Sequence, residues 1–129
     1  MSYSVNVLKD EIIKLKKDRL KKEKDETGFV HTVFFWFNDD VTDEQKKQFA
    51  DIGLADLITC KTIYKGYYGL PAQSPREVVD NSYGYALNCF FKSAEDEAIY
   101  QNDPQHLKFI ETYKHLWKRV QVYDNLVDH

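Results

Sequence analysis

The 129-residue chain lacks the features that mark secreted, membrane-spanning or disulfide-stabilised proteins. It has only two cysteines, Cys60 and Cys89, which is typical of reduced thiols in a cytoplasmic protein. No apolar run reaches the roughly 18 residues of a membrane span. Lysines and acidic residues interrupt the N-terminus, where a signal peptide requires a continuous apolar segment. The sequence therefore predicts a cytoplasmic protein with no membrane association.

The chain also has little that predicts a metal or a cofactor. No cysteine belongs to a C-x-x-C pair, and no glycine-rich loop precedes a helix to hold a phosphate group. The histidines are scattered along the chain, at His31, His106, His115 and His129. This pattern predicts neither a metal site nor a bound cofactor. A net charge of −3 produces no general attraction for nucleic acid or an anionic membrane.

Aromatic residues, in contrast, make up 15% of the chain. Aromatic side chains bury a large apolar area each, so a core can form in about 100 folded residues. Residues 1–27 differ from the rest, with eight basic and six acidic residues between Lys9 and Glu26. We expect a charged helix over residues 5–24, leaning on residues 28–129 or on a second subunit. A basic arm for nucleic acid and a disordered segment are the alternatives.

The pattern after residue 27 predicts an α+β fold. Strands are expected at 29–37, 59–66, 85–91 and 119–126, and helices at 42–57, 93–101 and 104–118, with one or two helical turns at 75–80. Thr42, Ser74 and Ser93 each begin a capping-box pattern. The order βαββαβ predicts a ferredoxin-like fold, in which one antiparallel four-stranded sheet carries helices on one face.

Residues 29–37 (FVHTVFFWF) are apolar on both faces of the predicted strand. One layer of helices covers only one face of a sheet, so the second face needs another cover. A second copy of the chain, packed sheet against sheet, meets this need. We therefore expect a homodimer.

Residues 100–117 (YQNDPQHLKFIETYKHLW) carry the most informative polar pattern. Asp103 suits the N-cap of a helix and Pro104 suits its first position. Helical spacing then places His106 over an apolar stripe, with Tyr100 just upstream. This arrangement predicts a pocket for a small apolar or aromatic ligand. Its expected lining is Tyr85, Ile110, Tyr113 and Trp117.

Several motifs together resemble the stress-responsive A/B barrel domain family, or Dabb. They are VHTVFF at 30–35, TDEQ at 42–45, FKS at 91–93, Y-x-x-D-P-x-H at 100–106 and VQVYD at 120–124. The resemblance covers about residues 29–126 and implies a dimeric α/β barrel. Asp103 departs from the family motif, which usually has His there, and residues 1–27 are an addition.

The resemblance also implies candidate catalytic residues. Most members of the family have no established reaction, but one plant member closes a polyketide by a cofactor-free intramolecular aldol reaction. The matching positions here are Tyr100, His106 and His31. These residues have structural readings too: His106 as a hydrogen-bonded residue at a helix start, Tyr100 as a packing residue and His31 as a core histidine.

Three functions follow from these observations. The first is a Dabb protein with a small-molecule pocket near Tyr100 and His106 and no turnover. The second is a cofactor-independent enzyme for a polyketide or aromatic carbonyl substrate, with His106 as general base. The third is an RNA-binding module, since NSYGYALN at 81–88 copies the centre of an RNA-recognition motif. The basic residue that begins that motif is missing here. The net negative charge of residues 28–129 also opposes phosphate binding, so we expect no nucleic-acid partner.

Overall fold

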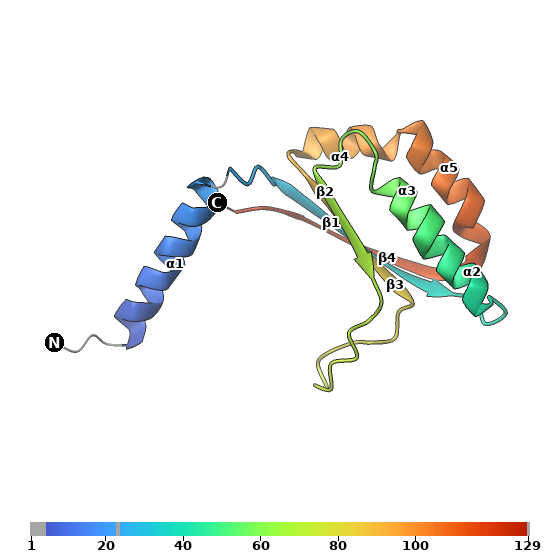
Figure 1. The fold of residues 1–129 in the computed structure, drawn as a ribbon, viewed down its shortest axis with the longest axis horizontal. Helices are drawn as coiled ribbons and strands as arrows, with labels where there is room; N and C mark the ends of the chain where they lie inside the picture. The colour runs from blue at the N-terminus through green and yellow to red at the C-terminus, as the bar shows by residue number, and fades with distance from the viewer. Residues whose placement is uncertain (1–4, 23, 129) are drawn as a thin grey trace.

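The computed structural model describes residues 5–22 and 24–128. Its elements, in order, are α1 (Val5–Lys22), β1 (Phe29–Phe37), α2 (Asp43–Gln48), the π-helical segment η1 (Phe49–Leu54), α3 (Ala55–Leu57), β2 (Lys65–Gly69), β3 (Tyr85–Phe91), α4 (Ala94–Gln101), α5 (Pro104–Tyr113), the 3₁₀ segment η2 (Lys114–Leu116) and β4 (Trp117–Leu126). The helices from α2 to α5 form one layer over one face of the sheet, and α1 stands apart from both layers (Figure 1). Within the described ranges, no helix is long and apolar enough to cross a membrane.

The sheet has the strand order β2-β3-β1-β4, and every neighbouring pair is antiparallel. This arrangement confirms the predicted ferredoxin-like α+β fold. The central strand β1 sets the register: Val33 lies opposite Leu87 of β3 and opposite Val122 of β4. Side chains along β1 alternate between a buried inner face under the helices and a half-buried outer face, as a strand with two apolar faces requires.

Polar side chains fix the helix starts that the sequence predicts. Thr42 forms a full capping box with Gln45. Ser93 accepts the backbone N–H of Asp96. The Asp103 carboxylate accepts the N–H of Gln105 at 2.9 Å, with Pro104 at the first position of α5. Each cap satisfies a backbone donor at the end of a helix, where no intrahelical partner exists.

Three predicted boundaries are wrong. The second strand begins at Lys65, not at residue 59, because residues 59–63 turn back onto the end of α3 through the hydrogen bonds Cys60 N–H to Leu57 and Ile63 N–H to Cys60. Cys60 therefore lies in a turn. Residues 75–80 contain a single turn, closed by the bond from Val79 N–H to the Arg76 carbonyl, and no helix.

The helix predicted over 104–118 ends at Tyr113. A short 3₁₀ segment follows, and Trp117 opens β4 in extended conformation. Trp117 therefore lies in a strand and not in the helix predicted from the sequence. The helix predicted over 42–57 is continuous but contains the π-helical segment η1. There, Ile52 is exposed although helical spacing predicts it to face inward.

The outer face of the sheet is rich in aromatic side chains. Phe34 packs against Tyr83 with 4.9 Å between ring centroids and lies 6.2 Å from the Tyr123 ring. The Arg119 guanidinium lies over the Trp36 ring at 4.3 Å. None of the helices α2 to α5 covers this face (Figure 1).

Candidate functional site

The site is built where three elements meet beneath the helical layer. β1 contributes His31 from its buried face, and α4 contributes Tyr100 from its last turn. The cap at Asp103 starts α5 in the position that turns His106 inward, and both His106 and Tyr100 are buried. The structure therefore brings together all three residues that the family resemblance singles out.

Tyr100 lies between the two imidazoles. Its ring centroid is 4.3 Å from that of His106, with the planes tilted by 33°, and 6.0 Å from that of His31 in an edge-on arrangement. Phe91 supports the Tyr100 ring from β3 at 5.3 Å. Aromatic neighbours on two sides limit the motion of the Tyr100 side chain.

A cavity of about 280 Å³ lies against these three side chains. Its polar lining is His31, Tyr100, Gln101, His106 and Asp124, while the rest of its lining is apolar. The apolar residues are Val33, Phe35, Leu57, Leu87, Phe109, Ile110, Trp117, Val120 and Val122. Few polar groups in a largely apolar cavity are typical of small-molecule sites.

Two of the four residues expected to line this cavity do so, and two lie elsewhere. Ile110 and Trp117 are in its lining, Trp117 from β4 instead of from a helix. Tyr85 packs against Phe37 in the core. The Tyr113 ring points to η1, where Gly53 leaves room for it; a Cβ on that glycine would lie 2.6 Å from the ring.

His31 is held by the carboxylate of Asp124, which is not among the predicted site residues. Its Nδ1–H donates to Oδ1 of Asp124 at 2.6 Å, because a carboxylate oxygen can only accept. The Asp124 position follows from strand register, which places it opposite His31 across the β1–β4 pair. Among the described residues, none hydrogen-bonds Nε2 of His31.

His106 has a similar arrangement with a backbone partner. Its Nδ1–H donates to the carbonyl oxygen of Gln101 at 3.3 Å, which leaves Nε2 without a partner in the described part of the chain. Burial lowers the pKa of His106 below its ordinary value, and the Gln101 hydrogen bond opposes this shift only in part. The imidazole is therefore neutral at neutral pH, with Nε2 free to accept a proton.

Tyr100 is a neutral phenol at neutral pH. Its side chain is 1% exposed, and burial raises the pKa of the phenol far above its ordinary value. No described residue hydrogen-bonds its hydroxyl. The phenol is thus an available hydrogen-bond donor beside a neutral imidazole.

The two cysteines are poor nucleophiles. Burial raises the pKa of Cys60 to about 11 and that of Cys89 to about 12, so both remain thiols.

Comparisons with known proteins agree with this architecture. The family model for the stress-responsive A/B barrel domain matches residues 29–127. The chain belongs to the Dabb family. The match begins at β1, so α1 lies outside the matched region of this Dabb chain. No curated protein matches the chain.

Solved structures share the Dabb fold at low identity. A protein of Arabidopsis thaliana is 22% identical, with a TM-score of 0.67, over 78% of this chain and 96% of that one. A dimeric ferredoxin-like protein of unknown function from Thermobifida fusca is 18% identical, with a TM-score of 0.65, over 78% and 92%. A hydroxynitrile lyase from Passiflora edulis is 18% identical, with a TM-score of 0.66, over 80% and 95%.

The position at which this chain departs from the expected Dabb motif has a structural role. Asp103 caps α5 through the N–H of Gln105, and the Gln105 side chain in turn donates to the Asp56 carbonyl at 2.8 Å. This position therefore fixes the start of α5 against α3, and with it the placement of His106.

Proposed function

We propose that this Dabb protein binds a small, largely apolar carbonyl compound in the cavity. His106 takes a proton from this compound, and Tyr100 stabilises the negative charge that develops on its oxygen. One observation carries the proposal. Three polar groups, Nε2 of His31, Nε2 of His106 and the Tyr100 hydroxyl, have no hydrogen-bond partner among the described residues and belong to side chains that line one apolar cavity. A few polar groups that converge on a largely apolar cavity orient a small-molecule ligand, so a ligand is their natural partner.

The chemistry is proton removal next to the carbonyl. His106 Nε2 accepts a proton from the α-carbon, and the electrons of the broken C–H bond form the enolate. The Tyr100 hydroxyl donates a hydrogen bond to the enolate oxygen, where negative charge develops. The protonated His106 then returns the proton to the carbon. In an aldol closure, the enolate carbon instead attacks a second carbonyl of the same molecule, and His106 gives its proton to the alkoxide oxygen that forms.

Binding without turnover is the simpler alternative, and the cavity supports it equally. The Passiflora edulis neighbour is an enzyme on this fold, whereas the Thermobifida fusca neighbour is of unknown function. Turnover in this chain therefore requires a direct test.

Hydrogen–deuterium exchange of acetophenone separates the two possibilities. Its methyl hydrogens lie next to a carbonyl and exchange slowly in neutral D₂O, and proton NMR follows their loss. We expect the protein to accelerate exchange and His106→Asn to reduce the acceleration by about 10² or more. His115→Asn is the matched control, because that side chain is exposed on η2.

The outcomes have distinct meanings. Ligand-induced shifts of the His31 and His106 ring signals without exchange would support binding alone. Neither shifts nor exchange, or exchange that His106→Asn leaves unchanged, would contradict the proposal.

We infer further that the chain pairs with a second copy through the outer face of its sheet. The half-buried Phe34 and Trp36 and the exposed Tyr123 form an aromatic surface there, and the helices α2 to α5 lie on the opposite side (Figure 1). A surface of this kind is typical of a protein interface. The neighbours from Thermobifida fusca and Bacteroides fragilis are dimeric proteins with this fold.

A further inference from the structure

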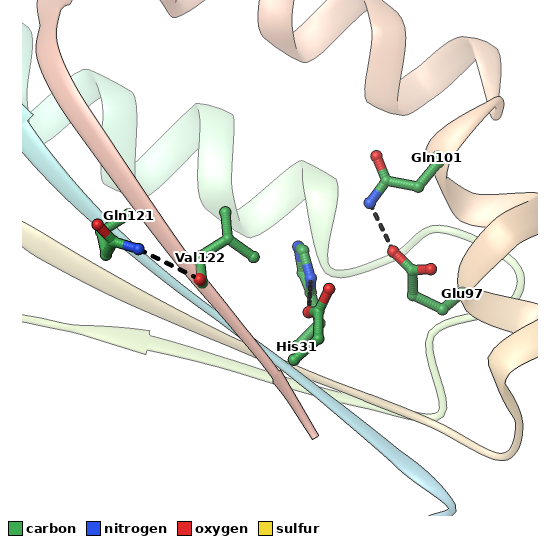
Figure 2. Close-up of polar contacts among 6 residues, drawn as sticks. His31, Glu97, Gln101, Gln121 and Val122 are labelled. Carbon is green, nitrogen blue, oxygen red and sulfur yellow. Dashed lines mark hydrogen bonds and ion pairs between the residues drawn. The ribbon is translucent and has the colours of Figure 1, made fainter. Parts of the chain in front are cut away.

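Three metal-ligating side chains converge at the polar end of the cavity. His31 of β1, Glu97 of α4 and Asp124 of β4 each place one ligand atom within 4.8 Å of the others. Figure 2 shows the His31 imidazole and the Glu97 carboxylate directed toward the same space between the sheet and α4. His31 is 5% exposed, so this group includes a fixed, buried imidazole and differs from a group of surface acids.

The geometry needs only small movements to enclose an ion. Ligand atoms about 2.1 Å from a tetrahedral ion lie roughly 3.4 Å from one another. Nδ1 of His31 and Oδ1 of Asp124 are already 2.6 Å apart, and an ion would replace the proton of this hydrogen bond. The Asp124 side chain is 42% exposed and Glu97 is half-buried, so both carboxylates have room to adjust around the fixed imidazole.

Neighbouring residues hold two of the three ligands. The Gln101 side chain donates to Oε1 of Glu97 at 2.6 Å, which orients the carboxylate and leaves Oε2 available (Figure 2). The His31 ring rests edge-on against Tyr100 and Phe91. A hydrogen bond from a neighbouring residue to a ligating carboxylate is characteristic of metal sites.

The donor atoms of these three side chains determine which ions the site prefers. One imidazole nitrogen and two carboxylate oxygens suit Zn²⁺, Mn²⁺ or Co²⁺, whereas Mg²⁺ and Ca²⁺ prefer oxygen alone. A divalent ion also balances the charges of the two carboxylates. Since His31 and Asp124 line the cavity, the ion's free coordination positions would be open to a ligand there.

We propose that His31, Glu97 and Asp124 form a binding site for a divalent transition-metal ion beside the cavity. The site does not depend on turnover or on the role of His106. A bound ion would supply a Lewis acid beside the cavity, and the exchange of acetophenone by metal-free protein tests the function proposed above separately.

The test uses the full-length, tag-free protein after treatment with EDTA. Isothermal titration with Zn²⁺, and the visible absorption of added Co²⁺, measure binding directly. We expect one ion per chain, and we expect Glu97→Gln and Asp124→Asn each to weaken binding by at least 10-fold. Both variants change partly accessible side chains by a single atom, so circular dichroism should show a retained fold.

Asp96→Asn is the matched control, because Asp96 lies on α4 beside Glu97 but outside the ligand group. Binding that is absent in the wild type would overturn the proposal. Binding that Glu97→Gln and Asp124→Asn leave unchanged would overturn it too, and would indicate adventitious ligation by exposed histidines such as His115.

Discussion

Tyr100 and His106 stack at the junction of α4 and α5, with 4.3 Å between ring centroids and 33° between ring planes. The stacking joins a phenol that burial keeps protonated to an imidazole that burial keeps neutral. A donor and an acceptor of protons are thus held side by side in one apolar cavity. Variants at Tyr100 and His106 distinguish a ligand-binding role of this pair from a purely structural one.

Removing the Tyr100 hydroxyl separates these two roles. No described residue hydrogen-bonds this hydroxyl, so Tyr100→Phe should change the free energy of unfolding by less than about 0.5 kcal/mol. It should nevertheless weaken binding of acetophenone, because the ligand oxygen loses a donor. Tyr113→Phe, at a ring outside the cavity, is the control. Urea unfolding and NMR titration provide the two measurements, and a strongly destabilised Tyr100→Phe protein would indicate a structural hydroxyl.

The depressed pKa of His106 predicts a pH dependence of stability. In the unfolded chain this imidazole binds a proton near its ordinary pKa of 6.5, whereas the folded protein resists protonation until lower pH. The unfolded state therefore binds more protons between these two values, so stability falls as pH drops below about 6.5. His106→Gln should flatten this part of the curve of unfolding free energy against pH.

His115→Gln is the control for that comparison, since the side chain is exposed and should leave the curve unchanged. If exchange catalysis exists, its rate should decline over the same acidic range as His106 becomes protonated. A curve for His106→Gln that matches the wild type from pH 5 to 7 would show that burial of this imidazole has no energetic consequence.

Gly28 tests the packing where β1 begins beside the end of β3, the two central strands of the sheet. A Cβ at this position would collide with the backbone carbonyl of Lys92, and the Gly28 N–H already donates to Phe91. Gly28→Ala should therefore destabilise the fold by about 1–3 kcal/mol. Gly69→Ala is the matched control, because a Cβ there meets nothing within 4 Å. Equal stability of the two variants in urea would contradict the described packing.

The inferred dimer predicts a change in mass when its surface is charged. Phe34→Glu places a carboxylate in the aromatic surface on the outer face, so the protein should elute as a monomer. Ile52→Glu is the control, since Ile52 is 62% exposed on the helical side. Size-exclusion chromatography with light scattering measures both. A wild-type monomer at micromolar concentration would overturn the inference.

The parts of the fold that follow from local chemistry were predictable from the sequence. The alternation of residues 29–37 reproduces the two faces of β1, and the caps at Thr42, Ser93 and Asp103 place three helix starts. Tertiary hydrogen bonds override local preference elsewhere. Residues 59–63 favour a strand by composition but fold back onto α3.

The site shows the same division. Tyr100 and His106 are close in sequence, so spacing and caps place them together. Asp124 joins His31 only through the β1–β4 register, and Glu97 approaches only through the packing of α4. Helical spacing predicts Tyr113 in the cavity lining, but its ring packs instead against η1, where the missing side chain of Gly53 leaves room for it.

A crystal structure of the protein soaked with acetophenone tests the central claim most directly. We predict ligand density in the cavity, with the ketone oxygen about 3 Å from the Tyr100 hydroxyl and the methyl group facing Nε2 of His106. Density confined to other surfaces, or a cavity that stays free of ligand at saturating concentration, would contradict a carbonyl-binding site at Tyr100 and His106.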